Sequence, residues 1–114
     1  MKIDSYSFGS ITIDGQIYNN DVIIHPDRIT TWWRKEGHLL QVVDVTPLLE
    51  DNPDILVVGT GYSGSMQIAR EVEQLCADRN VELLANRTTN SCQIFNRLAS
   101  QREISVIAAL HLTC

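Results

Sequence analysis

The second half of the chain alternates apolar runs with amphipathic segments, and this order limits the possible folds more than any other feature of the sequence. The run "DILVV" in 54–58 is almost entirely apolar, as expected of a strand covered on both faces. "VELLA" in 81–85 and "ISVIAALHL" in 104–112 repeat that pattern, whereas 68–78 and 88–99 have the spacing of amphipathic helices. We therefore expect a β-α-β-α-β unit whose helices pack on a sheet.

Capping residues predict where the helices begin. Thr88 or Thr89 is the expected N-cap of the last helix. Thr46 followed by Pro47 predicts a further short helix that begins there and ends before Pro53, since proline is favoured at the first helical position.

The first 45 residues have the two-residue period of β-strands. The segment 11–18, "ITIDGQIY", places Asp14-Gly15 between alternating apolar residues, which is a strong signal for a two-residue hairpin. A further strand is expected in 21–25. The segment 30–45 is ambiguous, but its tryptophans and β-branched residues favour strands around a turn at Glu36-Gly37.

Composition restricts the class of protein. The 114 residues suit a single domain over 1–114, with 44% apolar and 20% charged residues and a formal net charge of -5. That charge disfavours binding to a nucleic-acid backbone, so no nucleic-acid partner is expected. No segment approaches the roughly 18 apolar residues of a membrane span. Cys76, Cys92 and Cys114 form no C-x-x-C motif, which favours reduced thiols in the cytoplasm.

The stretch "GTGYSG" after the apolar run in 54–58 is written like a dinucleotide-binding turn. Such a site needs an acidic residue at the carboxyl end of the second strand, but Glu82 lies at the start of "VELLA". We therefore expect no dinucleotide and no other cofactor. Two readings stay open: a tight strand-to-helix turn, or a site for a small anion at a helix N-terminus. The candidate ligand-binding residues are Gly59, Thr60, Gly61, Tyr62, Ser63 and Ser65.

The segment "WWR" in 32–34 is the best candidate for a protein interface. Adjacent residues of an extended strand point to opposite faces, so we expect one tryptophan in the core and the other on the surface beside Arg34. Tryptophan and arginine are enriched in binding hot spots. The candidate interface residues are Trp32, Trp33, Arg34 and His38, and ordinary packing under a solvated arginine is the alternative.

No catalytic or metal site is expected. His111 and Cys114 carry zinc-binding groups, but a strand would not converge them on one ion. Ser63 and Ser65 lack the G-x-S-x-G elbow of acyl-transfer enzymes.

Four segments together resemble a known family: "FGSITIDGQIYNNDVIIHP", "WWRKEGH", "ILVVGTG" and "IFNRLASQREISVIAALHLTC". In this order they are similar to the small single-domain family that includes the adipogenesis-associated protein of animals and a mitochondrial respiratory complex I assembly factor. The resemblance runs from Phe8 to Cys114. The chain departs from many bacterial relatives after Asn96, where Gln101 and Glu103 replace an acid and an arginine.

The resemblance implies a compact three-layer α/β fold with a mixed central sheet, a C-terminal βαβαβ unit and an N-terminal β-hairpin element. It implies no established reaction. The matching positions are Phe8, Gly9, Asp14, Gly15, Tyr18, Asp21, Pro26, Trp32, Trp33, Arg34, Gly37, His38, Gly59, Gly61, Asn96, Leu98 and Ala108 to Leu110.

These observations favour a non-enzymatic, cytoplasmic binding or assembly-type domain with a protein partner. A weak homo-oligomer is a further option. The alternative function is the binding of a small anionic ligand, or weak catalysis on one, at the turn from Gly59 to Ser65.

Overall fold

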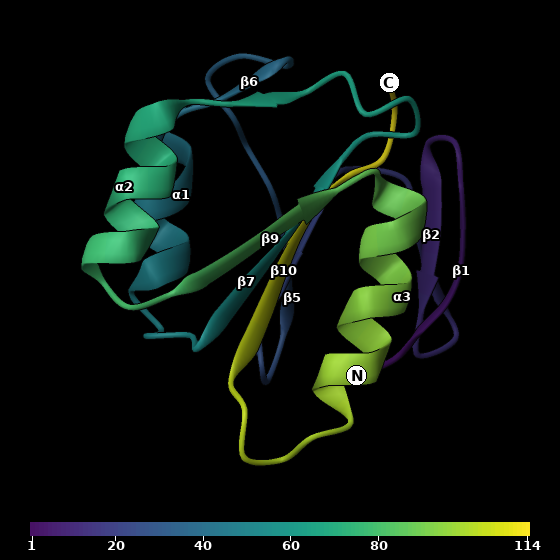
Figure 1. Ribbon diagram of the computed structural model, residues 1–114. Coiled ribbons are helices and arrows are strands. Elements are labelled where there is room, and N and C mark those ends of the chain that lie inside the picture. The colour runs from purple at the N-terminus through teal and green to yellow at the C-terminus, as the bar shows by residue number, and fades with distance from the viewer.

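A mixed five-stranded sheet forms the centre of the computed structural model, which describes residues 1–114 (Figure 1). Its strands are β4 (Val22–Ile24), β5 (Ile29–Thr31), β7 (Ile55–Thr60), β9 (Glu82–Asn86) and β10 (Val106–His111). Their order across the sheet is β5-β4-β10-β7-β9. Strands β7, β9 and β10 run parallel, while β4 and β5 add an antiparallel hairpin at one side.

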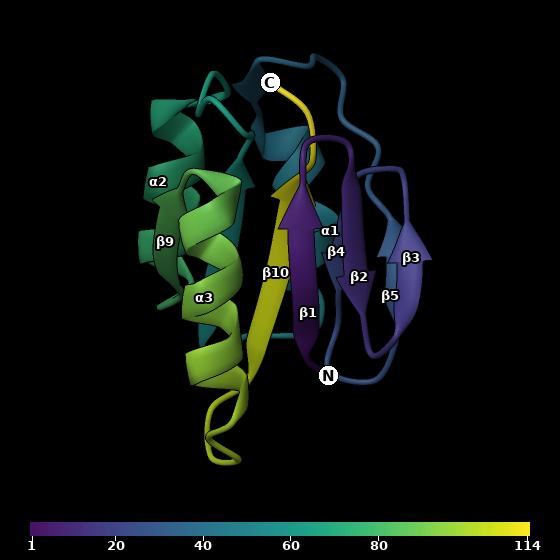
Figure 2. The same cartoon turned by 90° about the vertical axis from the view of Figure 1, so that its right-hand side faces the viewer.

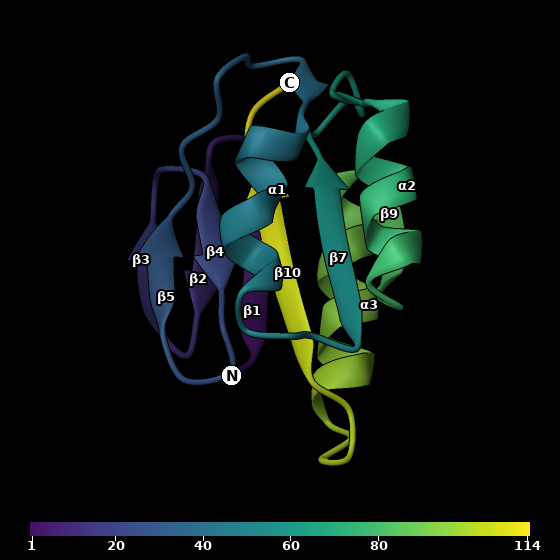
Figure 3. The same ribbon diagram turned by 90° about the vertical axis from the view of Figure 1, so that its left-hand side faces the viewer.

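Each face of this sheet is covered by a second layer. Helices α1 (Val42–Leu49) and α2 (Arg70–Asp78) lie on one face, as Figure 3 shows. The other face carries α3 (Thr88–Ala99) and a three-stranded antiparallel sheet (Figure 2). That sheet consists of β1 (Ile3–Ser7), β2 (Ser10–Ile13) and β3 (Gln16–Tyr18). The expected α/β class, mixed central sheet, C-terminal βαβαβ unit and N-terminal hairpin element are therefore confirmed.

The parallel strands separate two hydrophobic cores because alternate side chains point to opposite faces. Every residue of β7 and of β10 is buried. Leu56 and Val58 pack toward α1 and α2, whereas Ile55 and Val57 pack toward α3 and the β1–β3 sheet. This double coverage explains the unbroken apolar runs in the sequence.

The predicted hairpin turn is present. Asp14 and Gly15 have φ of 49° and 81° and join β2 to β3. Two successive positive φ values are typical of the type I′ turn, which an Asp-Gly pair adopts with little strain.

The start of α1 differs from the prediction. The helix begins at Val42 rather than at Thr46, so Pro47 lies inside it. Asp44 fixes the first turn, because its carboxylate accepts the N–H of Gln41 (2.9 Å). The burial of an apolar helix face outweighs both the β-propensity of "VVDV" and the hydrogen bond lost at Pro47. The predicted strand there is reduced to β6 (Leu39–Leu40).

The glycine turn does not open a helix, contrary to the prediction. A short strand, β8 (Gln67–Ile68), follows the turn and pairs with β6, and α2 begins only at Arg70. The capping prediction for α3 is also wrong, since Arg87 is the N-cap and Thr88 is already helical. None of the helices has the length and apolar character needed to cross a membrane.

Candidate functional site

The candidate residues gather where β7 and β10 end. The glycine turn (Gly59–Ser65) begins with the last two residues of β7 and continues beyond it, and the tail (Leu112–Cys114) follows β10. Because β4 and β5 run in opposite directions, the start of β4 and the tryptophan segment (Trp32–Arg34) after β5 lie at the same end. The N–H of Trp32 donates to the backbone oxygen of Asp21 there (2.9 Å). In Figure 2 the end of the chain lies between the β1–β2 turn and the segment that follows β5.

A buried polar cluster of Asp21, Arg34 and His111 holds this end together. Asp21 Oδ2 accepts from Arg34 Nη1 at 2.6 Å and lies 2.8 Å from His111 Nδ1. Its other oxygen accepts the backbone N–H of Leu112 at 2.8 Å. The exposed fractions of the side chains are 18% for Asp21, 6% for Arg34 and 8% for His111. The cluster therefore joins the start of β4, the tryptophan segment and the end of β10, and its side chains are largely shielded from solvent.

The neighbours of His111 in this cluster indicate which of its ring nitrogens carries a proton. Its Nδ1 lies 2.8 Å from the carboxylate of Asp21 and 3.0 Å from Arg34 Nη2. A carboxylate only accepts and a guanidinium only donates, so one nitrogen cannot satisfy both. We assign the proton to Nδ1, because the contact with Asp21 is the shorter one. Burial favours a higher pKa for Asp21, but hydrogen bonds from His111, Leu112 and Arg34 outweigh it and lower the pKa below its ordinary value.

The two tryptophans have different environments. Trp32 is 4% exposed and Trp33 is 84% exposed, which confirms that one is core and the other is surface. The guanidinium of Arg34 is not beside Trp33 in solvent: its Cζ stacks over the Trp32 ring, 4.7 Å from the centroid. His38 is exposed. Of the four candidate interface residues, Trp33 and His38 thus have exposed side chains, while the side chains of Trp32 and Arg34 are buried.

A hollow of about 300 Å³ lies beside Trp33. Its lining comes from the tryptophan segment, the residues before β4 and the tail: Asn19, Asn20, Asp21, Thr31, Trp32, Trp33, Arg34 and Thr113. Three buried nitrogens in the same region have no hydrogen-bond partner within the protein, namely Trp32 Nε1, Arg34 Nε and His111 Nε2. Polar groups without partners are thus concentrated at this end of the sheet.

An aromatic pair lies on the other side of the tail. Phe8 and Tyr62, which are 59% and 46% exposed, meet edge to face with centroids 5.9 Å apart. Tyr6 packs against Tyr62 and donates its hydroxyl to the backbone oxygen of Leu112 (2.8 Å), and burial raises the pKa of Tyr6 to about 12. No sequence pattern predicts this pair, since its members come from a hairpin turn and a loop that are distant along the chain.

The glycine turn is closed by the chain itself. The N–H of Gly61 donates to Thr88 Oγ1 (2.9 Å), and Thr88 in turn donates to the backbone oxygen of His111 (2.6 Å). The tail accepts from the turn as well, since Thr113 O receives the N–H of Tyr62 at 2.7 Å. The backbone N–H of Ser65 donates to the oxygen of Cys114 (3.2 Å). The backbone N–H groups of Gly61, Tyr62 and Ser65, which a bound anion could use, are therefore engaged within the chain.

The place of the tail explains this closure. In open α/β sheets, ligands bind outside the carboxyl ends of the strands, at the crevice where the connections diverge to the two faces. The chain leaves the sheet toward α2 after β7 and toward α3, on the opposite face, after β9, so this crevice lies between β7 and β9 (Figure 1). Thr113 and Cys114 continue from β10, the other neighbour of β7, and contact the glycine turn from that side. The anion-binding role of the six turn residues remains a prediction.

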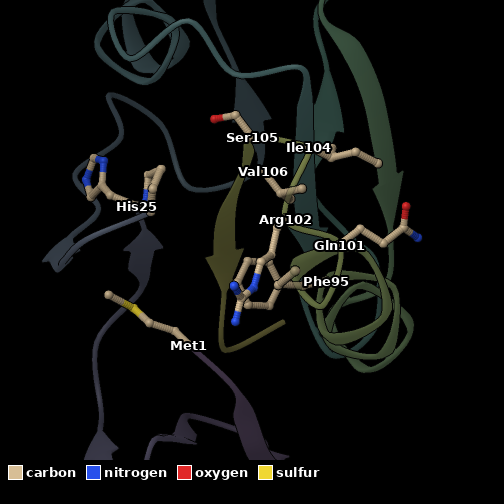
Figure 4. Close-up of a pocket in the computed structure, with 10 residues that line it drawn as sticks. Met1, His25, Phe95, Gln101, Arg102, Ile104, Ser105 and Val106 are labelled. Carbon is tan, nitrogen blue, oxygen red and sulfur yellow. The ribbon is translucent and has the colours of Figure 1, made fainter.

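A second hollow, of about 220 Å³, opens at the opposite end of the sheet (Figure 4). His25 lies at its wall, but both ring nitrogens are engaged, with Asp51 and Thr30 at 3.0 Å each. Arg102 is exposed, and no buried polar atom without a partner lines the hollow. This end offers fewer groups that could fix a ligand.

Two of the three cysteines, Cys76 and Cys92, are buried. Burial raises the pKa of the Cys92 thiol to about 12 and also raises the pKa of Cys76, so both are poor nucleophiles near neutral pH. No group of three or more His, Cys, Asp or Glu side chains is placed to hold a metal ion.

Comparisons with known proteins agree with this fold. The chain is similar to the conserved hypothetical protein PH1505 from Pyrococcus horikoshii OT3, with 27% identity, a TM-score of 0.90 and 100% of both chains covered. A structure named MT938 has 24% identity and a TM-score of 0.82, covering 99% of this chain and 98% of the other. A Bartonella henselae protein described as an outer membrane protein shares the fold at 20% identity and a TM-score of 0.80, covering 98% and 94%.

A family model matches residues 3–111, which is nearly the whole chain. Its description is "Protein of unknown function (DUF498/DUF598)". The chain therefore belongs to the DUF498/DUF598 family of proteins of unknown function.

Proposed function

We propose that this chain is a non-enzymatic protein-binding domain whose contact surface lies at the carboxyl ends of β7 and β10. The observation that carries the proposal is the 84% exposure of Trp33 on a segment anchored by the buried ion pair of Arg34 and Asp21. A large, exposed aromatic side chain on a fixed backbone loses little conformational entropy on binding, and tryptophan is enriched among binding hot spots.

The surroundings of Trp33 support a protein as the partner. The hollow beside it is lined by polar and aromatic groups, its two charged residues, Asp21 and Arg34, are paired with each other, and the Phe8–Tyr62 pair adds apolar surface across the tail. The net charge of -5 favours a protein over a nucleic acid. The resemblance to a family that includes an assembly factor supports the same class of function, and three free cysteines suit the reducing cytoplasm.

The alternative, an anionic ligand at the glycine turn, has less support. The turn leads into β8 rather than a helix, and its N–H groups at Gly61, Tyr62 and Ser65 already donate within the chain. A thermal-shift panel of nucleotides, flavins and phosphates tests it. A compound at 100 times its Kd would stabilise the fold by about 2.7 kcal/mol, and the absence of any shift would eliminate this alternative.

Affinity capture from extracts of the source organism tests the main proposal. The wild type, Trp33→Ala and the control Val43→Ala serve as baits, since Val43 is also exposed (62%) but lies on α1. Proteins recovered by the wild type and by Val43→Ala, but lost with Trp33→Ala, support the proposal. Identical recovery by all three baits contradicts it. Arg34 is unsuitable for this test because its loss would leave Asp21 buried without its ion-pair partner.

A further inference from the structure

Strand β9 is an outer edge of the central sheet and has free hydrogen-bonding groups. It has five residues, whereas β5 at the other edge has three. The N–H of Glu82 donates to Asp54 O (3.0 Å), so Glu82, Leu84 and Asn86 direct their backbone groups toward β7. Because this direction alternates along a strand, Leu83 and Ala85 direct theirs outward, and neither bonds elsewhere in the chain.

Most of the usual protections of an edge strand are missing from β9, whose one charged residue is Glu82 at its first position. Natural sheets discourage edge pairing with lysine, proline, bulges or a covering element. The sequence "ELLAN" contains no lysine or proline, and its register with β7 is continuous over the whole strand. An open edge of this length suits pairing with another strand.

An apolar hollow of about 410 Å³ adjoins this edge, between β9 and α2. Six of its seven lining residues are hydrophobic: Ile68, Cys76, Ala77, Val81, Leu83 and Ala85. The hollow therefore includes Leu83 and Ala85, the two residues whose backbone groups point away from β7. A strand added to β9 would cover apolar surface as well as satisfy backbone groups.

We propose that β9 pairs antiparallel with β9 of a second copy of this chain, around a two-fold axis at Leu84. Leu83 and Ala85 lie symmetrically on either side of that residue. Antiparallel pairing then sets Leu83 opposite the partner's Ala85, and Ala85 opposite the partner's Leu83, so each pair exchanges both of its backbone hydrogen bonds. The same patch serves both copies, as a two-fold interface requires.

Charge decides between the two directions of pairing. The antiparallel arrangement places Glu82 opposite the partner's Asn86 and near the partner's Arg87. A parallel arrangement in register would instead set Glu82 beside the partner's Glu82, and such like-charge pairs are unfavourable. The antiparallel arrangement also joins the two apolar hollows into one surface flanked by α2 of each copy. This inference concerns a different surface from that of Trp33 and does not depend on the proposed function.

Sedimentation velocity over a concentration series tests the pairing. We expect a concentration-dependent dimer for the wild type. Ala85 is exposed, so Ala85→Lys keeps the fold but places two lysines at the pairing edge, which weakens dimerisation by about 100-fold or more. Thr31→Lys adds the same charge to β5, the other edge, and leaves the dimer unchanged. A monomeric wild type, or a dimer that Ala85→Lys does not weaken, overturns the proposal.

Disulfide trapping tests the register independently, in a Cys114→Ser background. Residues 84 of the two copies would be directly opposed in a pair without hydrogen bonds, with Cα atoms about 4.5 Å apart, within the range of a disulfide. Residues 83 would be roughly 9 Å apart, too far to bridge. Leu84→Cys should therefore give a covalent dimer under mild oxidation, while Leu83→Cys stays monomeric on a non-reducing gel. Equal cross-linking of both, or of Leu83→Cys alone, rules out the pairing.

Discussion

The glycine turn and the tryptophan segment lie at the same end of the sheet, but the chain uses them in opposite ways. The turn makes internal contacts, since its N–H groups donate hydrogen bonds to Thr88 and to the tail. The tryptophan segment divides its side chains, burying Trp32 and Arg34 while exposing Trp33. Resemblance to a ligand-binding motif is thus a poor guide to which of the two remains available to a partner.

The two regions also differ in what stabilises them. Backbone hydrogen bonds and close packing hold the turn, whereas a buried charge cluster holds the tryptophan segment. Asp21 connects the two, because it pairs with Arg34 and also accepts the N–H of Leu112 at the start of the tail. Substitutions of charged residues should therefore affect mainly the tryptophan segment, and substitutions that add bulk should affect mainly the glycine turn.

The largest effect on the charge cluster is expected when Asp21 is replaced. Asp21→Ala leaves the guanidinium of Arg34 buried without its carboxylate and removes the acceptor of the Leu112 N–H. Breaking a buried pair in this way lowers the free energy of unfolding by about 3–5 kcal/mol, which urea denaturation measures.

Asp27→Ala is the matched control for this substitution. Asp27 also pairs with an arginine, Arg28, at 2.8 Å, but both side chains are largely exposed. An exposed pair contributes roughly 0–1 kcal/mol. Similar losses for Asp21→Ala and Asp27→Ala would mean that the cluster does not anchor the tryptophan segment.

A somewhat smaller effect is expected at the glycine turn. Gly61 has φ of 108°, and a Cβ there would meet the oxygen of Cys114, with Thr113 O at 2.7 Å. Gly61→Ala combines backbone strain with a clash against the tail, so we expect a loss of about 3 kcal/mol in the free energy of unfolding. Gly37→Ala is the control, because a Cβ there meets nothing within 4 Å. If Gly61→Ala is as stable as that control, the tail does not close the turn.

A pH series tests the contribution of the Asp21 charge to the stability of the tryptophan segment. The lowered pKa of Asp21 means that its contribution to stability is fully present above its ordinary pKa of 3.8. The contribution is lost as pH falls from that value through the folded-state pKa. The difference in unfolding free energy between the wild type and Asp21→Asn should therefore shrink below about pH 4. A difference that stays constant down to the acid transition would show that Asp21 is not held ionised by its neighbours.

Much of the fold was predictable because its signals are local. The apolar runs predicted β7, β9 and β10, and Asp14-Gly15 predicted the hairpin of β2 and β3. Errors arose where tertiary contacts outweighed local preference. Val42 begins a helix although its neighbours favour strand, since the burial of Leu48 and Leu49 on α1 decides the conformation.

The candidate site was harder to predict because it depends on contacts between distant segments. The adjacent tryptophans correctly indicated one buried and one exposed ring. The pairing of Arg34 with Asp21 and His111 had no signal in the sequence, since the residues are 13 and 77 positions from Arg34. Closure of the glycine turn by the tail was equally hidden, because only the adjacency of β7 and β10 brings them together.

The smallest effect is expected at Trp33, and it makes the contrast between the regions sharpest. Trp33 is 84% exposed, so Trp33→Ala should change the free energy of unfolding by no more than about 0.5 kcal/mol. Its neighbour Trp32 is 4% exposed and stacks with Arg34, and Trp32→Ala should cost about 3–5 kcal/mol. Urea denaturation of both variants measures the difference. A stable fold without the Trp33 ring means that this ring does little for folding, as the proposed contact surface requires. A loss at Trp33 comparable to that at Trp32 would instead make the ring structural and remove the basis of the proposed contact surface.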